Sequence, residues 1–157
     1  MHIIGIDPGT SRIGYAVISW DGKKPKSIIY GCWEIAIKEK GYRLQLINKN
    51  ISQLIKKYKP EYLASESVYF FNNAKTVMQV SEARGVIIFT AACHKVPMIE
   101  LAPAEVKQKL TGHGRAEKID IQNTVKKMLK LKFIPQPDDA ADALAIALAS
   151  LKKINLE

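Results

Sequence analysis

The sequence predicts an α/β fold in which a mixed five-stranded sheet is flanked by helices. Two observations lead to this prediction. The first third of the chain consists of apolar strands separated by turn residues, and the remainder alternates helical apolar spacing with two short apolar runs. The 157 residues can bury a substantial core and contain no long linker, so we expect residues 1–157 to form one domain.

Three strands open the predicted sheet: His2–Asp7, Gly14–Trp20 and Ser27–Ile37. Pro8-Gly9-Thr10 breaks the chain after the first strand, and Asp21-Gly22 is a turn signal after the second. The three strands are therefore expected to form two consecutive antiparallel hairpins.

Helical spacing begins after the third strand. Apolar residues between Leu44 and Tyr58 recur every three or four positions until Pro60, and Tyr62–Val68 is then a short apolar strand. The remaining predicted elements are a helix over Asn73–His94, a strand over Pro97–Leu101, and helices over Pro103–Leu110, Ala116–Leu131 and Asp138–Lys152.

Four acidic residues lie in apolar surroundings. Asp7 ends the first strand, Glu66 lies on the fourth, and Asp139 and Asp142 are three residues apart on one face of the last helix. Alanines keep that helix thin enough to lie close to the sheet, so the three elements can converge. Because packed carboxylates repel one another, such a cluster indicates an Mg²⁺ or Mn²⁺ site. The ordinary alternative for a single acid is structural; Asp138, for example, can be a helix N-cap.

Positive charge dominates the chain. It has 24 basic against 15 acidic residues and a net charge of +9. Between Glu105 and Lys132 eight basic residues stand against three acidic ones, which indicates a binding face for a polyanion, most commonly nucleic acid. The alternative is a general charge for solubility.

Residues beside the acids suggest how nucleic acid could be held. Three consecutive aromatics, Tyr69-Phe70-Phe71, cannot all face the core of one strand, so at least one is available to stack on bases or to wedge into an opened duplex. Lys107 and Lys118 flank the Gly112–Gly114 loop, where they are either phosphate clamps or solvated surface groups.

The helix over Asn73–His94 carries small and apolar residues around more than one face. Two interpretations fit: a fully buried core helix, or a helix that lies between the sheet and a second copy of the chain. No stretch is long enough to span a bilayer, the N-terminus lacks the pattern of a signal peptide, and Cys32 and Cys93 show no metal or redox spacing. We therefore expect a cytoplasmic protein without a membrane partner.

These motifs together resemble the RuvC-type Holliday junction resolvases, crossover junction endodeoxyribonucleases of the RNase H-like fold, over nearly the whole chain. The motifs that carry the resemblance are Ile4-Gly5-Ile6-Asp7-Pro8-Gly9, the Glu66 strand with its aromatic loop and Asn73, Ala83-Arg84-Gly85-Val86, Val106-Lys107 to Gly112, Ala116-Glu117-Lys118, and the run from Asp139 to Ala147.

The resemblance implies a homodimer that binds four-way junction DNA in homologous recombination and repair. It implies symmetric nicking of two opposed strands to leave 5′-phosphate and 3′-hydroxyl ends, with the branch-migration proteins RuvA and RuvB as partners. A two-fold substrate fits a two-fold enzyme.

The resemblance also assigns residues. Asp7, Glu66, Asp139 and Asp142 would hold two Mg²⁺ ions per active site, with Mn²⁺ as a substitute, and Asp138 is the alternative to Asp139. Lys107 and Lys118 match basic residues needed for cleavage. Tyr69 and Phe70 match aromatic positions near the junction, although phenylalanine is common where Tyr69 stands. The expected DNA-binding residues are Tyr69, Phe70, Lys107, Lys109, Arg115 and Lys118.

Three other functions compete with that of a resolvase. An RNase H-like nuclease could act on RNA precursors or hybrids, but the aromatic loop and the basic segment argue against it. An actin-like ATPase needs a second domain and more than 157 residues. A non-catalytic binding module would not need four converging acids.

Overall fold

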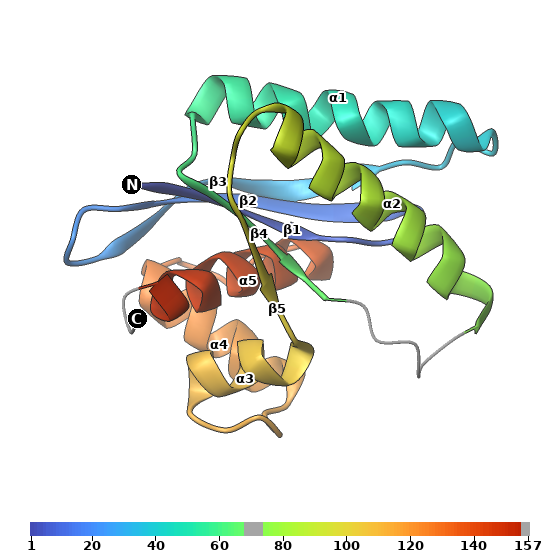
Figure 1. The fold of residues 1–157 in the computed structure, drawn as a ribbon. Helices are drawn as coiled ribbons and strands as arrows, with labels where there is room; N and C mark the ends of the chain where they lie inside the picture. The colour runs from blue at the N-terminus through green and yellow to red at the C-terminus, as the bar shows by residue number, and fades with distance from the viewer. Residues whose placement is uncertain (68–73, 155–157) are drawn as a thin grey trace.

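A five-stranded mixed sheet forms the middle layer of the protein (Figure 1). The computed structural model describes residues 1–67 and 74–154. In it, β1 (His2–Asp7), β2 (Arg12–Trp20) and β3 (Pro25–Glu34) form an antiparallel meander. β4 (Tyr62–Glu66) pairs parallel to β1, and β5 (Met98–Leu101) pairs parallel to β4. The strand order β3-β2-β1-β4-β5 confirms the predicted mixed sheet and both hairpins.

Helices cover both faces of the sheet. α1 (Lys40–Tyr58) and α2 (Ala74–Cys93) pack on one face, whereas α5 (Asp138–Ile154) lies against the other (Figure 1). α3 (Pro103–Thr111) and α4 (Lys118–Leu129) pack on α5. The three-layer α/β architecture is therefore the one that the sequence predicts.

Some predicted boundaries were wrong. The third strand ends at Glu34 rather than Ile37, because Glu34 is paired with Arg12 and β2 offers no partner beyond it. The fourth helix begins at Lys118 rather than Ala116, because Glu117 is its N-cap and the Asp120 carboxylate accepts a hydrogen bond of 3.1 Å from the Glu117 backbone N–H. β4 ends at Glu66, and Val68, the predicted end of this strand, lies outside the described residues. Asn73, the predicted start of the long helix, also lies outside them.

Alternation along β1 divides the core between the two faces. Ile4 and Ile6 are fully buried in the cluster formed with α1 and α2, whereas Ile3 is fully buried in the cluster that contains most of α5. Because successive strand side chains point to opposite faces, Asp7 follows Ile3 and Gly5 onto the α5 face. The first predicted acid is thus directed toward the helix that carries two others.

Two glycines let α5 lie unusually close to the sheet. A Cβ built on Gly5 would lie 2.2 Å from the Ala143 carbonyl oxygen, and one on Gly14 would lie 1.9 Å from the Asp139 carbonyl oxygen. Both distances are far below contact, so no larger residue fits without moving the helix. The start of α5 is therefore held directly over the ends of β1 and β2.

α2 is not a fully buried helix, which contradicts one of the two interpretations of its composition. Ala83, Ile87 and Ala91 are buried, but Met78 is 69% exposed and Phe89 is 63% exposed. Within its own chain, α2 packs along one row and leaves another uncovered.

Candidate active site

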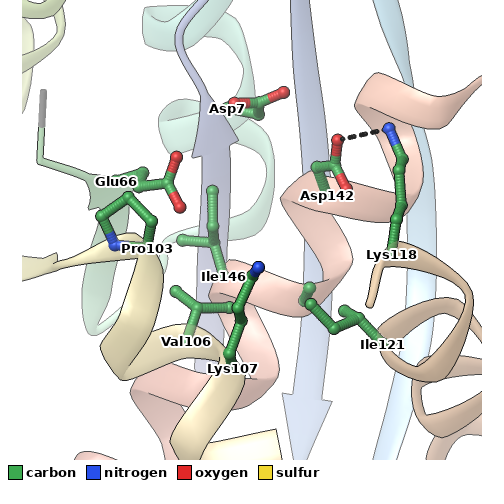
Figure 2. A pocket seen from close by; sticks show the side chains of 10 residues that line it. Asp7, Glu66, Pro103, Val106, Lys107, Lys118, Ile121, Asp142 and Ile146 are labelled. Carbon is green, nitrogen blue, oxygen red and sulfur yellow. Dashed lines mark hydrogen bonds and ion pairs between the residues drawn. The ribbon is translucent and has the colours of Figure 1, made fainter. Parts of the chain in front are cut away.

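Three of the four predicted acids surround one cavity of about 280 Å³ (Figure 2). Asp7 and Glu66 end β1 and β4, which are parallel neighbours, so both side chains lie at the same edge of the sheet. Asp142 reaches the cavity from the second turn of α5. The predicted convergence of three elements is present for these residues.

Lysines and apolar side chains complete the cavity wall. Lys107 comes from α3 and points toward the acids, and Lys118 is the first residue of α4 (Figure 2). The Lys118 Nζ lies 3.3 Å from an Asp142 carboxylate oxygen. The remaining lining residues are Pro103, Val106, Ile121, Ala145 and Ile146.

Asp139 is held by an arginine that the sequence reading missed. One carboxylate oxygen of Asp139 lies 3.2 Å from a guanidinium nitrogen of Arg12, at the start of β2. Asp139 does not line the cavity of the other three acids. Its spacing places Arg12 on the same strand face as Gly14, but the sequence does not show that Asp139 lies opposite that face.

Asp138 has a partner instead of a capping role. α5 begins at Asp138, so this residue lies within the first helical turn and its interpretation as the N-cap was wrong. Its carboxylate lies 3.2 Å from the Lys118 Nζ and accepts a hydrogen bond of 3.2 Å from the Gln122 side-chain amide. Lys118 is therefore anchored by two acids, Asp138 and Asp142.

The cavity strongly disfavours unscreened negative charge. Burial, followed by repulsion from Asp142, Glu66 and Asp139, raises the pKa of Asp7 to about 7. Burial and the negative charge of Asp142 raise the pKa of Glu66 to about 7. Burial also raises the pKa of Asp142, against the opposing effect of Lys118. Carboxylic acids with such pKa values mark a site that needs added positive charge.

The donors fit a hard divalent cation by their chemistry. All four acids offer oxygen ligands, which Mg²⁺ and Mn²⁺ prefer, and the raised pKa values show that cations would relieve repulsion here. Within residues 1–67 and 74–154, no three acidic, histidine or cysteine side chains are arranged closely enough to hold a metal ion as they stand. Two of the acids already form ion pairs: Asp139 with Arg12, and Asp142 with Lys118.

The other predicted residues are placed as follows. Lys109 lies at a separate hollow with Trp20 and Lys152, so the structure does not bring it to the acids. Arg115 is exposed between α3 and α4. Tyr69 and Phe70 lie outside the described residues. No helix in the described part of the chain is long and apolar enough to cross a membrane.

Comparison with known proteins agrees with this fold and identifies the family. Residues 3–150 match the family model of the crossover junction endodeoxyribonuclease RuvC. The RuvC of Fusobacterium nucleatum is 42% identical over 98% of this chain and 82% of its own length. That of Petrotoga mobilis is 47% identical over 94% and 91%. The Thermus thermophilus RuvC structure in complex with a Holliday junction superposes with a TM-score of 0.94 at 30% identity, over 99% of this chain and 96% of that one. The chain therefore belongs to the RuvC family of crossover junction endodeoxyribonucleases.

Proposed function

We propose that this protein resolves four-way DNA junctions by metal-dependent nicking of two opposed strands, leaving 5′-phosphate and 3′-hydroxyl ends. The observation that carries the proposal is the cavity in which Asp7, Glu66 and Asp142 meet two lysines. The clustered carboxylates would repel a polyanion, which the net charge of +9 attracts, so we assign them to catalysis rather than to DNA binding.

The acids would act as the metal ligands of the reaction. Asp7, Glu66, Asp139 and Asp142 would hold Mg²⁺, with Mn²⁺ as a substitute, and the group suits two ions. Cations bound there would activate the attacking water and stabilise the leaving oxygen. Asp139 is favoured over Asp138 as the ligand, because the run Asp139-Ala140-Ala141-Asp142 is the one that matches the family motif.

The lysines would position and neutralise the DNA backbone at the reacting phosphate. Lys107 faces the acids across the cavity, where its ammonium can approach a phosphate oxygen (Figure 2). Lys118 stays near the scissile position because two acids hold it. Lys109 and Arg115, with Tyr69 and Phe70, would contact DNA away from the reacting phosphate. We propose residues 1–157 as a single nuclease domain.

A homodimer would use the exposed row of α2. This row, which we define as Met78, Gly85, Ile88 and Phe89, is outward-facing in the single chain. Gly85 has no atom within 4 Å of a built Cβ, yet a mid-helix glycine costs about 1 kcal/mol relative to alanine. A second α2 packed closely against it would explain both the glycine and the exposed apolar side chains. RuvA and RuvB are the further partners that we propose from family membership.

A gel assay tests the function. The protein is incubated with a mobile four-way DNA junction and with linear duplex of the same sequence, in Mg²⁺ or in EDTA. Paired symmetric nicks in the junction alone, and only with metal, are expected. An RNA–DNA hybrid in the same panel tests the alternative nuclease: cleavage of the hybrid with an intact junction would replace the resolvase proposal.

A further inference from the structure

We propose that Arg12 is a built-in counter-ion of Asp139 that a divalent metal must displace, so that this arginine lowers the metal affinity of the free enzyme. The inference rests on the proposed metal site, and it assigns a positioning role to a residue outside the four acids and two lysines. In the metal-free protein Arg12 would keep Asp139 screened and turned away from the cavity.

The backbone places Arg12 where it must meet Asp139. Gly14 lies directly under the Asp139 carbonyl, and Arg12 is two residues earlier on the same face of β2. The turn before it is tight, because a Cβ on Gly9 would lie 2.0 Å from the Arg12 carbonyl oxygen. The guanidinium then reaches the Asp139 carboxylate at 3.2 Å.

Competition follows from the chemistry of the pair. A guanidinium donates hydrogen bonds to the lone pairs of the carboxylate that a cation would take, and it does not lose its charge at any working pH. The Arg12 side chain is 47% exposed, so it can move into water at little desolvation cost when a cation takes its place. The pair is therefore an exchangeable contact rather than a fixed structural one.

A comparison with Lys118 explains why metal binding would displace Arg12 from its carboxylate partner. Lys118 pairs with both Asp138 and Asp142, so it keeps one partner if Asp142 turns to a metal ion. Among the described residues, the ion pair of Arg12 is with Asp139 alone. Binding of a metal at Asp139 thus removes the whole ion pair of Arg12 but half of the anchoring of Lys118.

The test is a calorimetric titration of the full chain with Mn²⁺ in the absence of DNA. Arg12→Gln is expected to bind Mn²⁺ about two- to fivefold more tightly than the wild type, the range that an exposed ion pair supports. Lys24→Gln is the matched control, because it removes one positive charge from the exposed β2–β3 turn. Arg12→Lys, which retains the charge but lacks the planar fork, should fall between wild type and Arg12→Gln.

Metal-free melting gives a second readout. Without metal, Arg12→Gln is expected to lower Tm slightly and to show a larger rise in Tm on Mn²⁺ addition than wild type, since Asp139 has lost its screen. Unchanged or weaker Mn²⁺ binding in Arg12→Gln, with wild-type binding intact, overturns the inference. Asp139→Asn separates the two levels: if it binds Mn²⁺ as wild type does, Asp139 is not a ligand and the inference is overturned, whereas if wild type binds no Mn²⁺ the proposed metal site itself fails.

Discussion

The two long helices on opposite faces of the sheet are both rich in small residues, but they use them differently. α5 buries every residue from Ala140 to Leu151 except Asp142, and its backbone touches the sheet where Gly5 and Gly14 leave room. α2 buries Ala83, Ile87 and Ala91 but leaves Gly85 and its neighbours open.

This difference supports different roles for the two helices: α5 positions the active-site acids, and α2 is proposed to join two copies of the chain. Close approach of α5 is satisfied within the chain, and its result is that Asp139 and Asp142 lie over the strand that ends in Asp7. The corresponding space beside Gly85 on α2 is not filled by the chain itself. We therefore expect damage on the α5 face to stop catalysis without changing assembly, and damage on the exposed row of α2 to do the reverse.

The largest effect is expected from Asp7→Asn on the α5 face. Loss of this ligand should lower the nicking rate at least about a thousandfold, because a divalent ion contributes several kcal/mol to stabilisation of the transition state. Junction affinity should remain within a few-fold of wild type, because lysines dominate binding. Nicking rates and gel-shift affinities on one junction measure both, and full nicking activity would contradict the site.

Asp7→Asn is also expected to stabilise the metal-free fold. At pH 8 without metal, the raised pKa of about 7 means that the ionised Asp7 destabilises the fold, by up to about 4 kcal/mol. The neutral amide should therefore raise Tm in EDTA, by about 3 °C for each kcal/mol relieved. Sedimentation should show the same oligomeric state as for wild type.

Gly14→Ala should have the next largest effect. The added methyl would meet the Asp139 carbonyl oxygen, so the start of α5 must shift. Overpacking of this kind costs about 1–3 kcal/mol, and displacement of a ligand by about 1 Å can cost about 100-fold in rate. Thermal melts and nicking rates measure the two losses. Gly85→Ala is the control, because its methyl meets no atom of its own chain and should not lower the Tm of dilute protein.

Gly85→Arg tests the other side of the comparison. A long charged side chain in the middle of the exposed row should prevent two α2 helices from packing, so light scattering should report monomer. Paired nicking should then fall by about tenfold or more, since two active sites no longer act on one junction. Gln53→Arg, at an exposed position of α1, serves as the control for an added arginine. A Gly85→Arg protein that remains dimeric would place the interface elsewhere.

How much of this could be predicted from the sequence differs between the two faces. The order of elements along the chain, the two hairpins, the positions of Asp7 and Glu66 and the helical face of Asp142 follow from periodicity and turn residues, because these are local signals. The distance between α5 and the sheet was anticipated from the alanines, but the part of Gly5 and Gly14 was not. Their role depends on which residue stands opposite, which the chain order alone does not specify.

The ion pairs of Asp138 and Asp139 could not be predicted from the sequence. Asp139 was expected to join the other acids, yet it is paired with Arg12, and Asp138 was interpreted as an N-cap although it holds Lys118. Side chains of residues 12 and 139 meet only through the register of β2 and the depth of α5. Such contacts depend on tertiary geometry, and no spacing in the sequence encodes them.

The smallest expected effect is the pH response, which should also belong to the α5 face alone. Asp7 and Glu66 both have a pKa of about 7 in the folded chain, above the ordinary values of 3.8 and 4.5. Between about pH 4 and pH 7 the folded state therefore binds more protons than the unfolded state, so metal-free stability falls as pH rises through this window. Metal binding requires the ionised acids, so Mg²⁺ affinity should rise with pH through the pKa of about 7 and level off above about pH 8.

Lowering the pH from 8 to 6 should accordingly reduce nicking about tenfold at limiting Mg²⁺, and excess Mg²⁺ should recover most of the loss. Rates measured across a matrix of pH and Mg²⁺ concentration distinguish this from acid damage to DNA binding, which excess metal would not repair. The exposed row of α2 contains no ionisable side chain, because its members are Met78, Gly85, Ile88 and Phe89. The dimer dissociation constant should thus be equal at pH 6 and pH 8, and a dimer that dissociates at pH 6 would show that the two faces are coupled.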